Sequence, residues 1–175
     1  TFFNEDIVAH VIMADPFCTN LSKILSDIGE KHIPSGRQLH RKGTYLAMEG
    51  PAFSTRAESN LYRQWGCSII GMTNHTEARL AREAEIAYAS LSMVTDYDCW
   101  NQTKEEVSVE MVIENLKINT EVANKIIFET AKVIDINRPD SKAHQSLKDG
   151  LMTSKGKASK EAHSKVRILT DKYWC

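Results

Sequence analysis

Long apolar runs are missing from this sequence of 175 residues, and glycine and proline are sparse. No apolar stretch approaches the ~18 residues that a membrane-spanning helix needs, so a membrane protein is excluded. Eight glycines and four prolines are too few for a collagen or a low-complexity chain. Hydrophobic residues make up 42% and charged residues 26%, which is typical of one globular domain with a real core.

Paired cysteines are also missing. The four cysteines stand alone along the chain, at Cys18, Cys67, Cys99 and Cys175. None belongs to a C-x-x-C pair, and no cysteine–histidine spacing matches a zinc site. The sequence therefore predicts neither a metal site nor a disulfide framework. Isolated cysteines favour a reducing compartment, so we expect a cytoplasmic protein.

The net charge of −1 provides no basic field that would hold a nucleic acid, so neither a nucleic acid nor a membrane is expected as a partner. The charge is distributed unevenly, because residues 141–175 hold 8 lysine or arginine side chains against 3 aspartate or glutamate side chains. The turn-rich stretch Arg138–Ser141 marks the boundary. We therefore predict one domain over residues 1–140. Residues 141–175 are interpreted as a basic, weakly patterned tail, a surface appendage that is partly helical or disordered.

Apolar runs alternate with helical patterns along residues 1–140. Strands are predicted at residues 7–13, 43–49, 67–73 and 86–95. Helices are predicted at residues 21–29, 55–66, 74–85 and 108–127. This alternation predicts an α/β fold, with a central, mixed but largely parallel sheet flanked by helices. The last helix is capped by Ser108 and is expected to turn seven apolar side chains inward: Val109, Val112, Ile113, Leu116, Val122, Ile126 and Ile127.

The carboxyl ends of parallel strands are where α/β sheets bind their ligands. Asp96 and Asp98 follow the last predicted strand, and in extended geometry their side chains point to the same side. Two carboxyl groups there could accept hydrogen bonds from amino groups or share a proton with a ring nitrogen. By pattern alone, a solvated turn that uses aspartate as a cap is a slightly better explanation.

Other strand-end residues also have two interpretations. Thr73 precedes a helix, so its hydroxyl could bind phosphate with the helix amides, although a simple helix cap fits the spacing better. Phe53 could stack on a flat ring or merely pack, and Met72 is more typical of a core. Arg56 and Glu58 lie in a first helical turn, where an opposed pair is more often structural than catalytic. The pattern alone names no reaction.

Four segments carry a more specific signal. They are Met13–Cys18 (MADPFC), Glu49–Ser59 (EGPAFSTRAES), Ile70–Thr73 (IGMT, followed by Glu77) and Thr95–Trp100 (TDYDCW). In this order they resemble segments of the S-methyl-5′-thioadenosine phosphorylases, which belong to the trimeric purine nucleoside phosphorylases. The resemblance covers about residues 1–135 and fades in the basic tail.

The resemblance implies an activity and an assembly. Enzymes of this family cleave the N-glycosidic bond of methylthioadenosine with inorganic phosphate. The products, adenine and 5-methylthioribose 1-phosphate, feed purine and methionine salvage. Phosphate is a co-substrate, and no cofactor is implied. The expected partners are therefore a purine nucleoside, phosphate and two further copies of the chain in a homotrimer.

The resemblance also implies roles for individual residues. Asp96 would donate a hydrogen bond or a proton to the five-membered ring of the purine. Asp98 would support Asp96 and accept from the exocyclic amine. Relatives that act on oxo-purines would have asparagine in place of Asp96. The remaining contacts would come from Phe53 and Ile70 at the base, Met72 under the ribose, Thr73 at the phosphate, Val109, Val112 and Ile113 near the methylthio group, and His10 in a neighbouring subunit's site.

The sequence departs from the family pattern in two places. His75-Thr76 stands where the family has Val-Pro, which leaves the shape of that loop open. The family's glycine-rich phosphate loop and its arginine–histidine segment lie upstream of the matched region. Because the chain starts at Thr1-Phe2-Phe3 without an initiator methionine, we interpret it as the C-terminal part of a longer protein, rather than as a chain with a processed start.

We expect residues 1–175 alone to catalyse little phosphorolysis, since Thr73 offers only one hydroxyl and a helix start for phosphate. Two alternatives remain. One is a related phosphorylase that acts on another purine nucleoside, such as adenosine or inosine. The other is a truncated chain that binds purines or assembles with subunits without turnover.

Overall fold

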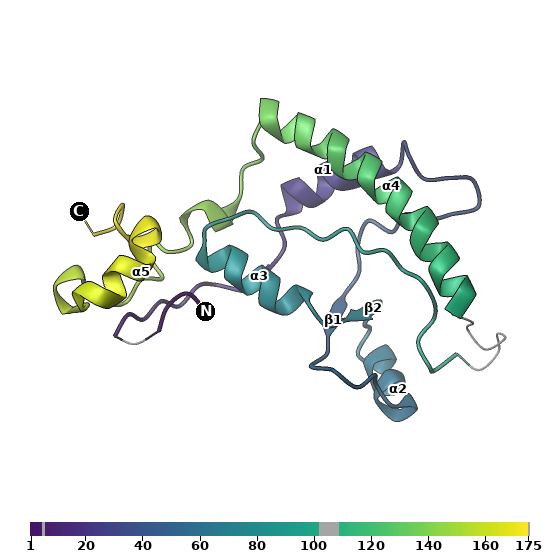
Figure 1. The fold of residues 1–175 in the computed structure, drawn as a ribbon, viewed down its shortest axis with the longest axis horizontal. Coiled ribbons are helices and arrows are strands. Elements are labelled where there is room, and N and C mark those ends of the chain that lie inside the picture. The colour runs from purple at the N-terminus through teal and green to yellow at the C-terminus, as the bar shows by residue number, and fades with distance from the viewer. Residues whose placement is uncertain (5, 102–108, 175) are drawn as a thin grey trace. The chain divides into compact units, whose positions relative to one another are not determined.

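The computed structural model describes residues 1–4, 6–101 and 109–174, which form two compact units (Figure 1). The first unit contains Thr1–Ser22, His75–Ala89 and Pro139–Cys175, and the second contains Lys23–Asn74 and Ser90–Arg138. Across the described ranges, no helix combines the length and the hydropathy needed to cross a bilayer.

The second unit contains a parallel β–α–β arrangement. Strand β1 (Tyr45–Ala47) pairs in parallel with β2 (Ile69–Gly71), and α2 (Arg56–Gln64) connects them. Tyr45 pairs with Ile69 and Ala47 with Gly71 in the register of the two strands. This arrangement confirms the predicted α/β class. Within the described residues the sheet has these two strands, so it is smaller than the sheet that the sequence predicted.

Helix α2 begins where the capping box predicts. The hydroxyl of Thr55 accepts from the backbone N–H of Glu58, and the carboxylate of Glu58 accepts from the backbone N–H of Thr55. The two contacts satisfy amide groups that have no partner within the first turn of a helix. The carboxylate of Glu58 accepts from the backbone N–H of Thr55 and also from its hydroxyl, and these two hydrogen bonds, the backbone one first, hold the pKa of Glu58 below its usual value. Gly66, at φ +79°, follows the end of the helix, where left-handed geometry favours glycine.

Two predicted strands are wrong. Residues 7–13 are all described, and they form no strand. Ala9 alone forms an antiparallel bridge, with Leu151. Residues 86–95 are irregular throughout. The carbonyl groups of Val94 and Thr95 accept from side-chain amides of the following helix instead of from a neighbouring strand. An apolar run predicts burial, and burial is not specific to strands.

Helices α1 (Thr19–Gly29) and α4 (Val109–Ile136) confirm two of the predicted helices, although the expected cap Ser108 lies outside the described residues. Gly29 at the end of α1 is closely packed, because a Cβ there would lie 2.8 Å from Leu39 and 3.5 Å from Ile126 on α4. A larger residue would therefore force these side chains apart.

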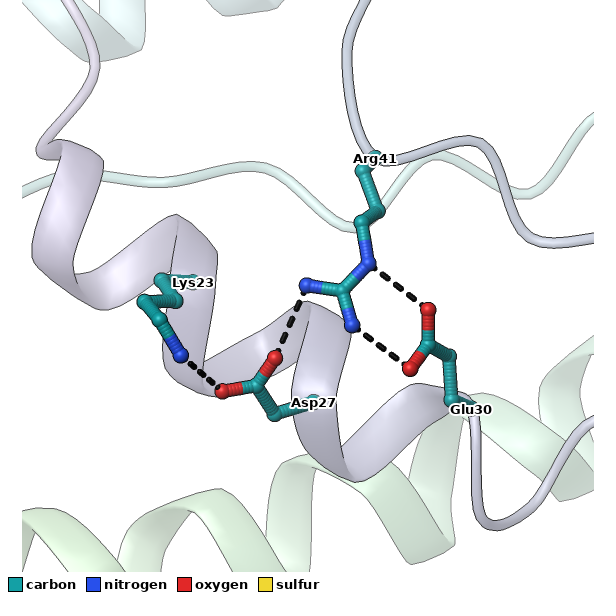
Figure 2. A network of polar contacts seen from close by, with 4 residues as sticks. All are labelled: Lys23, Asp27, Glu30 and Arg41. Atoms are coloured by element: carbon teal, nitrogen blue, oxygen red, sulfur yellow. Dashed lines mark hydrogen bonds and ion pairs between the residues drawn. The ribbon is translucent and has the colours of Figure 1, made fainter.

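Figure 2 shows an ionic network at the end of α1. The guanidinium of Arg41 contacts both Asp27 (2.8 Å) and Glu30 (2.6 Å), and Lys23 also reaches Asp27 (2.5 Å). The hydrogen bonds within this network lower the pKa of both carboxyl groups and raise the pKa of Arg41. The network ties the loop after α1 to the helix itself, although exposed ion pairs of this kind stabilise a fold only weakly.

The first unit overturns the interpretation of residues 141–175 as a surface appendage. Three short helices form there: η1 (Lys142–Gln145), η2 (Lys155–Lys157) and α5 (Lys160–Thr170). Leu147, Ala162, Val166 and Trp174 are buried against Phe3 and Ile7 near the start of the chain, so both ends of the chain build one core. The net charge of the segment did not predict its packing, because its lysines are exposed while several of its sparse apolar residues are buried.

Helix α3 (Asn74–Glu83) ends at a group of buried charged residues in the same unit. The guanidinium of Arg82 donates to the carbonyl groups of Ile12 (3.0 Å) and Asp15 (2.5 Å). Glu85 has a φ of 58°, which non-glycine residues rarely adopt. Its carboxylate accepts from the hydroxyl of Tyr173 and from the backbone N–H of Leu147, and it pairs with Lys172.

Candidate active site

Nine of the ten candidate site residues lie in the second unit, where Phe53 follows β1, and Met72 and Thr73 follow β2. The backbone N–H of Met48 donates to the carbonyl of Gly71 (2.8 Å), which continues the pairing one residue beyond β1. Gly50 follows at φ +73°, and a Cβ there would lie 2.9 Å from the sulfur of Met72. The backbone conformation at position 50 therefore favours glycine, and a side chain there would also displace the thioether of Met72. The two strand ends meet as the sequence predicted.

Apolar side chains at these strand ends are available to a ligand. Phe53 is 87% exposed, so it does not pack into the protein in the described structure. Met72 is also exposed, and Ile70 on β2 is half-buried. An exposed aromatic ring and an exposed thioether are each suited to cover a flat apolar ligand. The alternative that Phe53 merely packs is not what the structure shows.

The two carboxyl groups of the loop after Thr95 have different partners. Asp96 is exposed, and its Oδ1 accepts from the hydroxyl of Thr95 at 2.5 Å. Asp98 is half-buried. Its Oδ2 accepts from the hydroxyl of Ser59 at 2.5 Å, and its Oδ1 accepts from the backbone N–H of Cys99 at 2.8 Å. Asp96 is thus the more accessible of the two, and Asp98 is the more firmly held.

Helix α2 holds this loop through further contacts. The Nε of Arg56 donates to the carbonyl of Cys99 (3.1 Å), and the guanidinium of Arg63 lies 3.7 Å above the ring of Trp100. Tyr97 meets Trp100 edge to face, with ring centroids 5.9 Å apart. Arg56 holds the loop and Glu58 caps the helix. Both residues therefore have structural contacts, as the sequence pattern favoured.

Sequence reasoning assigned no role to Ser59, Arg63 or Trp100, although Ser59 and Trp100 end two of the four segments that carry the resemblance. The available signal was spacing, because Arg56, Ser59 and Arg63 recur at three and four residues and therefore share one face of α2. A polar face on a helix usually faces solvent, so the pattern alone gave no reason to assign a neighbour.

Thr73 lies directly before α3 and is exposed. Its hydroxyl donates to the side-chain oxygen of Asn74 at 3.4 Å. An exposed hydroxyl at the start of a helix is compatible both with a cap and with an anion site. Thr73 therefore remains a candidate for holding phosphate.

The apolar residues at the start of α4 are less buried than expected. Val109 is 68% and Ile113 is 60% exposed, and Val112 is half-buried. Further along the helix, Leu116 and Ile127 are also exposed, Val122 is half-buried, and Ile126 alone of the seven is fully buried. The expectation of a uniformly inward face is therefore wrong, because residues in the described ranges cover only part of it.

His10 belongs to the first unit, and its side chain is exposed. Its backbone N–H donates to the carbonyl of Gly150 (2.7 Å). Among the described residues, no group of three histidine, cysteine, aspartate or glutamate side chains is arranged to hold a metal ion.

Comparisons with known proteins place these features in context. A sequence profile of the phosphorylase superfamily matches residues 1–132. The chain is 62% identical, over 99% of its length, to an S-methyl-5′-thioadenosine phosphorylase of Prochlorococcus marinus, and 51% identical to the one of Thermosynechococcus vestitus. It covers 55% and 60% of those two proteins, so it spans little more than half of their length. The similarity includes the basic tail, where the motif resemblance had faded.

Solved structures give the same picture. A methylthioadenosine phosphorylase from an Antarctic soil metagenomic library matches 96% of this chain, with a TM-score of 0.90 and 44% identity, and 58% of that chain is covered. A methylthioadenosine phosphorylase from Schistosoma mansoni, solved in complex with adenine, matches 83% of this chain, with a TM-score of 0.69 and 30% identity, and 57% of that chain is covered.

Proposed function

Because the chain belongs to the phosphorylase superfamily, we propose that it serves the phosphorolysis of S-methyl-5′-thioadenosine to adenine and 5-methylthioribose 1-phosphate. The observation that carries the proposal is the arrangement of the strand ends in the second unit. There, an exposed aromatic ring, Phe53, follows β1 and an exposed helix-start hydroxyl, Thr73, follows β2, and the same unit contains the exposed carboxyl group of Asp96. Relatives that share this segment at up to 62% identity are named for this reaction.

The proposed chemistry breaks the bond between adenine and C1′ of the ribose, and an oxygen of phosphate bonds C1′ in its place. The electron pair of the broken bond leaves with adenine, which is a poor leaving group as an anion. A proton or a strong hydrogen bond from Asp96 to the five-membered ring stabilises the departing base. Asp98 supports Asp96 and accepts from the exocyclic amine of adenine.

Binding of the substrate divides between apolar and polar groups. Phe53 and Ile70 cover the base, Met72 lies under the ribose, and Thr73 contributes to the phosphate site. The exposed start of α4, with Val109, Val112 and Ile113, lines the apolar site of the methylthio group. An apolar site discriminates between small groups by only about 1–3 kcal/mol, so we expect preference rather than strict exclusion of a 5′-hydroxyl.

The assembly and setting belong to the same proposal. The protein works as a homotrimer, in which His10 reaches the site of a neighbouring subunit, and light scattering that finds a monomer would count against this. Phosphate is the co-substrate, and the reaction uses no cofactor. The cytoplasm is the proposed location, because the cysteines stand alone in the sequence.

Comparing substrates tests the proposed function. Asp98, held beside Asp96 in the same loop, presents an acceptor to the amine of a 6-amino purine, whereas an oxo-purine offers no donor at that position. The protein produced from its natural gene should therefore release base faster from methylthioadenosine than from inosine, at equal phosphate. A faster rate on inosine would contradict the proposal. A faster rate on adenosine than on methylthioadenosine would favour the related adenosine phosphorylase.

A further inference from the structure

One face of α2 is devoted to the loop that carries Asp96 and Asp98. Arg56, Ser59 and Arg63 share this face, and each contacts a different part of the loop. Arg56 binds the carbonyl of Cys99, Ser59 binds the carboxylate of Asp98, and Arg63 stacks on Trp100. The thiol of Cys99 adds a contact of 3.5 Å to the carbonyl of Ser54, just before the helix.

Ser59 is the most buried of these three residues. It is 1% exposed, and its Oγ donates to Oδ2 of Asp98 at 2.5 Å. The other oxygen of Asp98 accepts from the backbone N–H of Cys99. Both oxygens of the carboxylate are therefore held from inside the protein. Hydrogen bonds to an ionised oxygen are roughly twice as strong as neutral ones, and together these two fix the rotamer of Asp98.

We propose that Ser59 is a positioning residue for the reaction, which holds Asp98 and, through the short loop, sets the place of Asp96 against the purine. This inference rests on the proposed function. Ser59 does not touch the substrate itself. It acts through Asp98, because a carboxylate that is fixed at both oxygens anchors the loop, whereas the side chain of Asp96, two residues earlier, remains exposed.

The capping box gives this arrangement its rigidity. Thr55 and Glu58 fix the first turn of α2, directly before Ser59. A group placed on a well-capped helix holds its partner more reproducibly than a group on a loop, and an error of about 1 Å in a catalytic group can cost roughly 100-fold in rate. Removing the hydroxyl of Ser59 should therefore reduce kcat more than it raises KM.

Two substitutions at position 59 and one control test this role in the protein produced from its natural gene. Ser59→Ala removes the hydroxyl and keeps a good helix former, and Ser59→Cys nearly preserves the volume with a weak donor. Asn60→Ala changes the exposed neighbouring residue on α2. The readouts are kcat and KM for methylthioadenosine, together with the rate at which a thiol reagent labels Cys99, followed by mass spectrometry of the peptide.

We expect both Ser59 variants to lose about 10- to 100-fold in kcat with a smaller change in KM, and to label faster at Cys99. Asn60→Ala should match the unsubstituted protein in both measurements. Unchanged kcat and unchanged labelling in Ser59→Ala, which has no donor at this position, would overturn the positioning role. If the unsubstituted protein shows no phosphorolysis, the proposed function fails, and the labelling rates at Cys99 still decide whether Ser59 holds the loop.

Discussion

Asp96 and Asp98 are separated by one residue, yet their carboxyl groups have different surroundings. Asp98 is bound at both oxygens by Ser59 and the backbone of Cys99, whereas Asp96 is exposed. This difference suits a division of labour, in which the exposed Asp96 serves the departing base and the firmly held Asp98 keeps the loop in place beside its contact with the exocyclic amine.

The first prediction concerns Asp96. Asp96→Asn keeps the size of the side chain but removes the acid that serves the five-membered ring of adenine, and it introduces the asparagine that relatives acting on oxo-purines would have. Loss of a general acid typically costs about 100- to 10,000-fold in rate, and we expect a loss in this range on methylthioadenosine. The loss on inosine should be smaller, which would relax the selectivity for 6-amino purines. Steady-state rates on both substrates measure the effect.

Asp135→Asn is the matched control, because Asp135 is exposed on α4. It should leave both rates unchanged. Full turnover of methylthioadenosine by Asp96→Asn would refute the role of Asp96.

The candidate residues themselves were identified from the sequence, whereas their supports were not. Phe53, Met72 and Asp96 follow apolar runs, and the rule that ligands bind beyond the carboxyl ends of strands located them. Ser59 and Arg63 belong to a polar helix face that resembles any solvated surface. Whether such a face meets solvent or a loop depends on tertiary packing, which a sequence pattern does not encode.

At the scale of elements, helices were predicted better than strands. The capping box at Thr55 and the glycines at positions 29 and 66 mark helix ends by local chemistry, so α1 and α2 match their predicted ranges closely. Strands need a partner, and apolar runs at residues 7–13 and 86–95 contained no information about one. Both runs became irregular segments whose polar groups are bonded in other ways.

The second prediction concerns the contact between α3 and the C-terminal segment. Burial alone would raise the pKa of Glu85, but hydrogen bonds from Lys172, Tyr173 and the backbone of Leu147 outweigh it, so the pKa is lowered overall. A lowered pKa means that folding favours the charged form. The resulting stabilisation is fully present above the ordinary glutamate pKa of about 4.3 and is lost as the pH falls through the lower value in the folded protein.

Urea unfolding at several pH values tests this contact. Glu85→Gln should reduce the free energy of unfolding by roughly 1–3 kcal/mol at neutral pH, because it weakens hydrogen bonds to a charged group. The difference from the unsubstituted protein should shrink below about pH 4, where the carboxylate is protonated in the unfolded chain. Glu161→Gln, on the exposed side of α5, is the control. A Glu85→Gln effect that is independent of pH would contradict the account.

At the scale of the whole molecule, the two ends of the chain are the main surprise. The shift from acidic to basic composition near residue 140 predicted a separate tail, yet Trp174 and Val166 share a core with Phe3 and Ile7. The charged residues that dominate the composition of this segment lie at its surface. Contacts between residues more than 140 positions apart leave no pattern in the local sequence that would predict them. The α/β class, by contrast, was evident from the alternation of elements.

The central claim is that this protein serves phosphorolysis, in which phosphate rather than water receives the ribosyl group. The most direct test is to incubate the protein produced from its natural gene with methylthioadenosine, with and without inorganic phosphate, and to identify the sugar product by mass spectrometry. The account predicts adenine and 5-methylthioribose 1-phosphate, formed only when phosphate is present. Release of adenine at the same rate without phosphate, with free 5-methylthioribose as the product, would contradict it.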